Sequence, residues 1–154
     1  MDDLIEFCGP KCVEYQDFFL PLLSSNLKSQ HAQLRQAAAY GFGMLAKHGG
    51  ESFAQIVSDT VPIMIEIVQN VNSRLAENIW ATDNCVAAVT KIIEFNNSRV
   101  DVENLIPIWL NWLPIWDDEQ EVHYVYSFLY NLLRRYVLFV IDFLIFSNFY
   151  LFFF

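Results

Sequence analysis

Three apolar stretches in this sequence each carry a proline at their centre, and their spacing limits the folds that the chain can adopt. They are Phe19–Leu23, Thr60–Met64 and Leu105–Trp109, with prolines at positions 21, 62 and 107. The intervals from 21 to 62 and from 62 to 107 are 41 and 45 residues. Tandem repeats of paired helices have periods of about 40 to 47 residues. The spacing therefore predicts a repeat architecture, with a bent helix at the same place in each repeat.

Each of these three proline-containing stretches is followed by a second helical stretch. These second stretches cover Leu34–Lys47, Glu77–Phe95 and Gln120 to about Arg135. Apolar residues recur at helical spacing up to about residue 135, and no alternating apolar and polar run indicates a strand. We therefore expect an all-α HEAT-repeat superhelix of about three helix pairs over residues 1–135, with approximate repeats 13–49, 52–95 and 101–135. Because such repeats bury their apolar faces only against neighbours, we also expect the chain to be a fragment of a longer solenoid.

The residues between these stretches are typical of helix ends. Gly49 and Gly50 follow one helix and are predicted to close it, since glycine tolerates the left-handed backbone found there. Ser52 and Gln55 match a capping box that would open the next helix. Asp117-Asp118 place negative charge where the last helix begins, at its positive end.

Several of these segments together resemble a known family. The stretches Leu34–Gly43, Asp83–Cys85 and Pro107–Pro114 resemble the carboxy-terminal repeats of the importin β superfamily, in particular the importin-five (Ran-binding protein five) class. The resemblance covers about residues 2–133. It implies a fragment of a receptor that carries protein cargo into the nucleus and moves between cytoplasm and nucleus. It also implies basic cargo proteins, Ran-GTP and nucleoporins as partners of the full-length parent, cargo loading on the concave face, and no cofactor.

The helix predicted over Glu77–Phe95 carries the candidate cargo-binding residues. On a helical wheel, Ala81, Cys85, Val86, Val89 and Ile92 form one face, and Trp80, Asp83, Ala87, Lys91 and Glu94 lie opposite, with Glu77 and Asn84 at the edge. An exposed Trp80 beside carboxylates would accept a lysine or arginine side chain by stacking and charge pairing. We therefore select Glu77, Trp80, Asp83 and Asn84 as the candidate site. The alternative is that Trp80 packs on the next repeat and the charged residues are only solvated.

A tryptophan cluster and a glycine-containing run can each be interpreted either as packing residues or as a binding site. Trp109, Trp112 and Trp116 recur at helical spacing, either as core residues or as a pocket for Phe-Gly motifs of nucleoporins. The short run Gly41-Phe42-Gly43 lacks the third glycine and the preceding strand of a nucleotide-binding fingerprint. Small residues at these positions would instead allow two helices to approach closely.

Other functions are disfavoured by charge and by residue spacing. Nine Lys and Arg against eighteen Asp and Glu give a formal charge of −9, which disfavours nucleic-acid binding. Cys8 and Cys12 have no second ligand pair that would complete a zinc site. The three histidines and three cysteines form no nucleophile or acid–base motif, so we expect no enzyme.

The last nineteen residues, 136–154, differ from the rest because they are apolar apart from Asp142, Ser147 and Asn148. Nineteen residues approach the roughly 20 that cross a bilayer, which would make this tail a membrane anchor. The other interpretation is that the tail is not native protein sequence and comes from translated non-coding bases. Two alternatives to the transport receptor therefore stay open: a generic HEAT scaffold subunit of a protein complex, and a tail-anchored helical membrane protein.

Overall fold

The chain folds into consecutive helices. The computed structural model describes the backbone of residues 2–152 and the side chains of residues 4–137. The elements over this range are α1 (Asp2–Cys8), η1 (Gly9–Tyr15), α2 (Gln16–Leu27), α3 (Ala32–His48), η2 (Glu51–Phe53), α4 (Ala54–Gln69), α5 (Ile79–Phe95), α6 (Val102–Leu110) and α7 (Glu119–Phe152), where η marks a 3₁₀ helix. None of the described residues forms a strand, so the predicted all-α class is confirmed.

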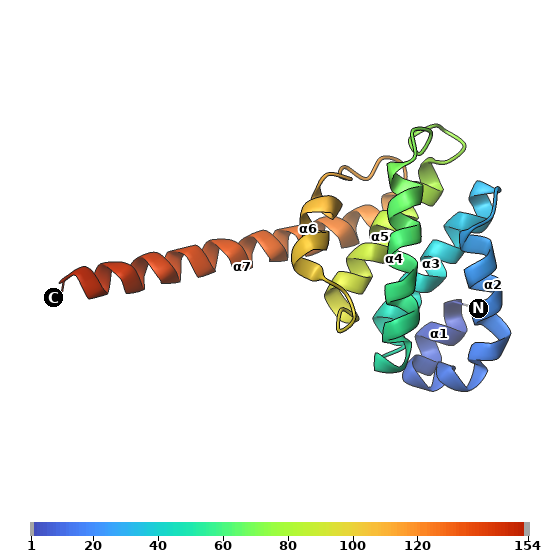
Figure 1. The fold of residues 1–154 in the computed structure, drawn as a ribbon, viewed down its shortest axis with the longest axis horizontal. Helices are drawn as coiled ribbons and strands as arrows, with labels where there is room; N and C mark the ends of the chain where they lie inside the picture. Colours follow the sequence, from blue (N-terminus) through green and yellow to red (C-terminus); the bar gives the residue numbers. More distant parts are fainter. Residues whose placement is uncertain (1, 153–154) are drawn as a thin grey trace.

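The helices are arranged in two layers (Figure 1). The proline-containing helices α2, α4 and α6 form one layer, and α3, α5 and α7 form the other. Helix α2 packs on α3 and α4 packs on α5. Helix α6 meets α7 through Trp109 and Phe128, whose rings lie edge to face with centroids 5.4 Å apart. The three expected helix pairs are therefore present, in the expected order.

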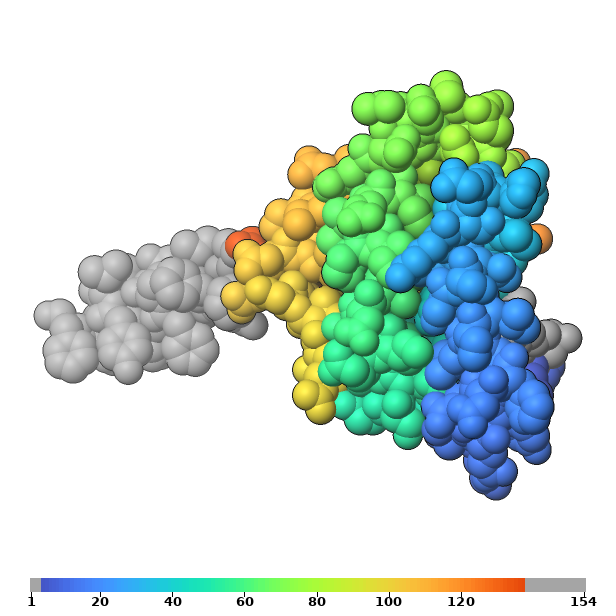
Figure 2. Space-filling view, turned by 45° about the vertical axis from the view of Figure 1, so that its right-hand side comes forward, coloured from blue at the N-terminus to red at the C-terminus, as the bar shows by residue number. Residues whose placement is uncertain are grey.

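The two layers differ in how closely their helices pack. The most extensive contact between described helices joins α3 to α5. A Cβ atom placed on Gly43 of α3 would lie 3.2 Å from the Cα of Ala88 in α5, so the absence of a side chain permits this approach, as the sequence predicted. Helices α2, α4 and α6 succeed one another across the outer face (Figure 2) and contact each other much less. Helices α3, α5 and α7 are therefore the more closely packed layer, which we call the inner layer.

The prolines lie at equivalent places in the outer layer. Pro21, Pro62 and Pro107 are inside α2, α4 and α6, and all three are exposed. Proline leaves a backbone carbonyl without its helical partner, and on an exposed face water can satisfy that carbonyl. The repeated position predicted from the sequence is therefore confirmed.

Two of the three predicted helix ends are confirmed and one is wrong. Gly50 has a φ of 76°, in the left-handed region, just after α3. Asp118 Oδ1 accepts the backbone N–H groups of Gln120 and Glu121 at 3.1 and 3.3 Å and so caps α7. Ser52 does not cap α4, because it lies inside η2 and no side chain caps either element. The 3₁₀ turn displaces the start of α4 beyond the serine.

Two of the three repeated tryptophans belong to the core. Trp109 is fully buried, and its Nε1 donates a 2.8 Å hydrogen bond to Thr90 Oγ1. Trp112 is also buried, whereas Trp116 is 58% exposed and lies against the Arg74 guanidinium. The packing interpretation therefore holds for Trp109 and Trp112.

The structure describes only part of the predicted tail. Helix α7 continues without a break past Arg135. No helix of the described residues combines the length and apolar character needed to cross a membrane. Beyond Val137 the tail lies outside the residues whose side chains are described. Both interpretations of residues 136–154 stay predictions.

Candidate functional site

A groove of about 680 Å³ opens between the three helices of the inner layer. Four of its lining residues carry carboxylates, and none is Lys or Arg. The remaining lining residues are mostly amide-bearing or aromatic. Its residues are Gln33, Gln36, Ala37 and Tyr40 of α3, Trp80 and Asn84 of α5, and Asp117, Asp118, Glu119, Gln120 and Glu121 at the start of α7.

Trp80 provides the apolar surface of the groove. It is 46% exposed, which confirms the predicted exposure, in a helix that is otherwise buried from Ile79 to Ile93. A tryptophan face attracts lysine and arginine side chains, and neighbouring carboxylates add charge pairing. Asp117 and Glu119, both exposed, supply these carboxylates.

Asn84 lies deeper in the same groove. Its Nδ2 donates to the Trp80 carbonyl at 2.9 Å and to Asp118 Oδ2 at 2.7 Å. The residue is only 3% exposed, so these two hydrogen bonds hold its amide inside the protein. Asn84 thereby ties the Trp80 backbone to Asp118, next to the start of α7.

Asp83 does not face a ligand, and the predicted outward orientation is wrong. Its side chain is fully buried, and Oδ1 accepts from Arg74 Nη1 at 2.8 Å. Oδ2 accepts the backbone N–H groups of Trp116, Asp117 and Asp118 at 3.0, 2.8 and 3.2 Å. The helical wheel assumed one buried and one free face. Helix α5, however, is the middle helix of its layer and contacts α3 on one side and α7 on the other.

Lys91, also placed on the free face by the wheel, is buried in an ion pair with Glu121. Its Nζ donates to the two carboxylate oxygens at 2.6 and 2.8 Å and lies 5.4 and 5.1 Å from the ring centroids of Tyr40 and Tyr124. Burial lowers the pKa of Lys91, and the Glu121 carboxylate opposes that shift. Burial and a 2.6 Å hydrogen bond to Glu94 raise the pKa of Tyr124. Glu121 is therefore already neutralised, and Asp118 is buried, where it accepts from Asn84 and from the backbone of Gln120 and Glu121. Of the four carboxylates, Asp117 and Glu119 are left for a ligand.

The structure thus brings together part of the predicted site. Trp80 and Asn84 share the groove, Asp83 is structural, and Glu77 is exposed in the turn before α5, outside the groove lining. Sequence reasoning missed both carboxylates: Asp117 was treated only as a favourable charge at a helix start, and Glu119 was not considered. Aligning the starts of neighbouring helices would have placed them beside Trp80, since adjacent repeats stack in register.

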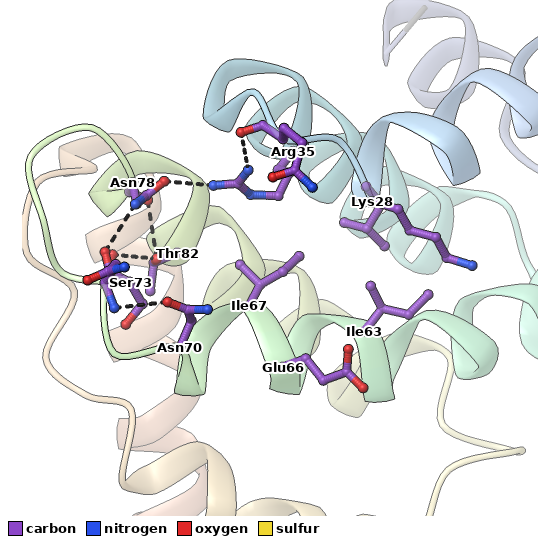
Figure 3. Close-up of a pocket in the computed structure, with 12 residues that line it drawn as sticks. Lys28, Arg35, Ile63, Glu66, Ile67, Asn70, Ser73, Asn78 and Thr82 are labelled. Atoms are coloured by element: carbon purple, nitrogen blue, oxygen red, sulfur yellow. Dashed lines mark hydrogen bonds between the residues drawn. The ribbon is translucent and has the colours of Figure 1, made fainter.

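A second pocket, of about 490 Å³, lies near the turns of the first two repeats (Figure 3). Arg35 points across it and donates to the carbonyls of Ser29 and Gln30 and to Asn78 Oδ1. Thr82 likewise donates to a neighbouring carbonyl, that of Ser73. Because these polar groups bond to one another, this pocket offers a ligand fewer partners than the groove at Trp80.

The outer layer contains a smaller apolar crevice of about 260 Å³ between α4 and α6. Val61, Pro62, Ile65, Leu105 and Ile108 form its apolar surface. Among the side chains that the structure describes, no group of three or more His, Cys, Asp or Glu is placed to hold a metal ion.

Comparison with known proteins relates most of the chain to one group of proteins. No family model matches the sequence. The chain is 31% identical over 134 residues to importin subunit beta-3 of Saccharomyces cerevisiae, covering 86% of this chain and 12% of that protein. It is 31% identical over 126 residues to the probable importin-5 homolog of Dictyostelium discoideum, covering 77% of this chain and 12% of that protein.

Solved structures give the same result. A crystal structure of Kap121p bound to RanGTP matches with a TM-score of 0.77 and 30% identity, over 85% of this chain and 12% of that one. Kap121p bound to the SUMO protease Ulp1p matches with a TM-score of 0.76 at the same identity and coverage. The chain therefore spans about an eighth of the length of these relatives, and its helix pairs follow the HEAT-repeat solenoid of Kap121p.

Proposed function

This chain belongs to the importin β superfamily, and we propose that it forms part of the cargo-contacting concave surface of a nuclear import receptor. The single observation that supports this most is the groove at Trp80. It lies on the inner layer, combines an exposed aromatic ring with exposed carboxylates, and has no Lys or Arg among its lining residues. The proposal includes no enzymatic step, because the groove holds no nucleophile next to a general base.

The chemistry of the groove selects a basic segment of a cargo protein. A lysine or arginine side chain would stack on Trp80 and pair with Asp117 or Glu119. Ran-GTP and nucleoporins are proposed as further partners of the whole receptor, which would move between cytoplasm and nucleus; relatives of this chain include Kap121p bound to RanGTP.

A peptide-binding measurement on this chain tests the proposal. The probe is a short fluorescent peptide of lysine and arginine, with a glutamine peptide of equal length as the neutral control. Trp80→Ala removes the exposed ring and is expected to weaken binding by about 2- to 5-fold. Glu103→Gln, an exposed change on the outer helix α6, is the matched control and should leave the affinity unchanged. Equal binding of both peptides, or no effect of Trp80→Ala, would contradict the proposal and favour a generic HEAT scaffold.

A second candidate function is contact with Phe-Gly segments of nucleoporins. The crevice between α4 and α6 is apolar and lies on the outer layer, whereas Trp109 and Trp112 are buried and offer no such pocket. Ile65→Asp would place a charge in this crevice and is expected to abolish binding of a Phe-Gly peptide while leaving the basic peptide bound. Unchanged Phe-Gly binding in this variant would exclude the crevice.

A further inference from the structure

Asp83 makes an unusual concentration of hydrogen bonds between two repeats. One carboxylate oxygen accepts three consecutive backbone N–H groups, from Trp116, Asp117 and Asp118, and the other accepts from Arg74. Carboxylates bonded to several backbone amides hold them in one geometry, and such charge-assisted bonds are stronger than neutral ones. The side chain has no solvent exposure, so these bonds are not shared with water.

Arg74 extends the same cluster to the rest of the segment that joins α6 to α7. Its Nη2 donates to the Trp112 carbonyl, and its guanidinium lies 5.3 Å from the Trp116 ring centroid. Residues 111–118 contain no helix or strand. Their path is therefore fixed largely by contacts of this kind rather than by secondary structure of their own.

This segment carries one of the groove's exposed carboxylates and leads directly to the other. Asp117 lies within it and Glu119 is the first residue of α7. Asn84, the neighbour of Asp83, binds Asp118 Oδ2 and the Trp80 carbonyl at once. Two adjacent residues of α5 thus set the position of the acidic side of the groove relative to its aromatic side.

We propose that Asp83 is a positioning residue for the ligand groove: it holds the backbone of residues 116–118 so that Asp117 and Glu119 stand beside Trp80. This inference rests on the proposed function of the groove. Asp83 contacts no ligand and acts only through the carboxylates that it places. Helices α5, α6 and α7 are also joined by the Lys91–Glu121 ion pair and the Trp109–Phe128 contact. Releasing Asp83 should therefore loosen the segment without separating the helices.

The test compares Asp83→Asn with a variant of the carboxylates that it positions. In the full chain, Asp117→Asn combined with Glu119→Gln is expected to weaken binding of the basic peptide about 5-fold. Asp83→Asn, which keeps the side-chain size but removes the charge, is expected to weaken it about 3-fold. Because Asp83 acts through these carboxylates, adding Asp83→Asn to the double variant should change the affinity little. If Asp83 did not act through these carboxylates, the losses of affinity caused by Asp83→Asn and by the double variant would multiply in the triple variant. That result would overturn the inference.

Hydrogen exchange provides a readout that is independent of peptide binding. Asp83→Asn should speed exchange at the amides of residues 116–118 while leaving those in the middle of α5 protected. If circular dichroism shows that Asp83→Asn does not fold, Arg74→Met replaces it in the test. This variant retains the three backbone hydrogen bonds to Asp83 and should lose less affinity. Adding it to the double carboxylate variant should likewise change the affinity little. Unchanged exchange and affinity in the folded variant would overturn the inference while the effect of Trp80→Ala still supports the groove. A wild-type chain that ignores the basic peptide would instead overturn both.

Discussion

Replacing Glu121 by glutamine should destabilise the chain strongly and make its stability depend on pH in a defined direction. In the native chain Glu121 accepts both hydrogen bonds from Lys91 Nζ, and the two side chains are only 8% and 6% exposed. Glu121→Gln keeps the size of the side chain but leaves the Lys91 ammonium buried without its counter-charge. Removing one partner of a buried pair typically costs about 3 to 5 kcal/mol.

The lysine itself sets an upper limit on this cost. Instead of staying charged, Lys91 can lose its proton on folding, which from an ordinary pKa of 10.5 costs about 5 kcal/mol at pH 7. The rings of Tyr40 and Tyr124 near the ammonium reduce the cost of the charged form. We therefore expect the free energy of unfolding of Glu121→Gln to be lower than that of the wild type by about 3 kcal/mol at pH 7.

The direction of the pH dependence follows from the same residue. Burial lowers the pKa of Lys91 in the folded chain, and in the variant Glu121 no longer opposes that shift. The folded state then binds fewer protons than the unfolded state, so stability rises with pH until the unfolded lysine titrates near 10.5. Between pH 7 and 10 the deficit of Glu121→Gln should shrink by up to about 1.4 kcal/mol per pH unit.

Urea denaturation followed by circular dichroism at several pH values measures both quantities. The control is Lys91→Met combined with Glu121→Gln, which has no titratable group at this place and should show the same pH slope as the rest of the chain. It should also be more stable at pH 7 than Glu121→Gln alone, since no charge is left buried. A deficit of Glu121→Gln that is below about 1 kcal/mol, or that does not change with pH, would refute the assignment of Lys91 as a buried, counter-ion-dependent cation.

Three further perturbations probe other parts of the structure. Gly43→Val should lower the free energy of unfolding by about 3 kcal/mol in urea denaturation, because its Cβ would stand 3.2 Å from the Ala88 backbone; a neutral effect would mean that α3 and α5 are not closely packed. Trp109→Ala should lower the melting temperature far more than Trp116→Ala, since it removes a fully buried ring worth about 3 to 5 kcal/mol; similar shifts would contradict the assignment of Trp109 to the core. A thiol reagent at pH 8 should modify the exposed Cys8 rapidly and the buried Cys12 and Cys85 only after unfolding. Burial raises the pKa of the Cys12 thiol and brings that of Cys85 to about 12, so neither forms the reactive thiolate readily. Rapid reaction of all three thiols in the folded chain would contradict the burial.

The sequence predicted correctly the features that depend on neighbouring residues or on the repeat length. Prolines 41 and 45 residues apart mark three outer helices because each repeat places the same bend at the same point. Gly50 closes α3 because a residue with a φ of 76° must lack a side chain to avoid strain. The capping box failed although its signal is local, since Glu51, Ser52 and Phe53 form a 3₁₀ turn that a four-residue pattern does not distinguish from the first turn of an α-helix.

The candidate site was predicted only in part because its residues come from three helices. A helical wheel gave Trp80 its correct exposure, since no neighbouring helix covers the start of α5 on that side. The same wheel exposed Asp83 and Lys91. Each has partners 30 or more positions later in the chain, such as Trp116 for Asp83 and Glu121 for Lys91. Asp83 also binds Arg74 in the preceding turn. A wheel treats one helix in isolation and cannot represent neighbours on both of its sides.

The burial of these polar residues follows from the packing of the inner layer. Its helices lie close together, so a polar side chain between them meets another helix before it meets a ligand and must find its partner within the protein. Asp83, Asn84 and Lys91 each bind a residue from the start of α7. Three groove-lining side chains that stay exposed, Trp80, Asp117 and Glu119, lie at or just before the start of a helix, and the proposed function assigns the ligand contacts to them. This arrangement predicts that ligand-binding side chains of such a repeat lie in the first turns of the inner helices rather than along their whole outward faces.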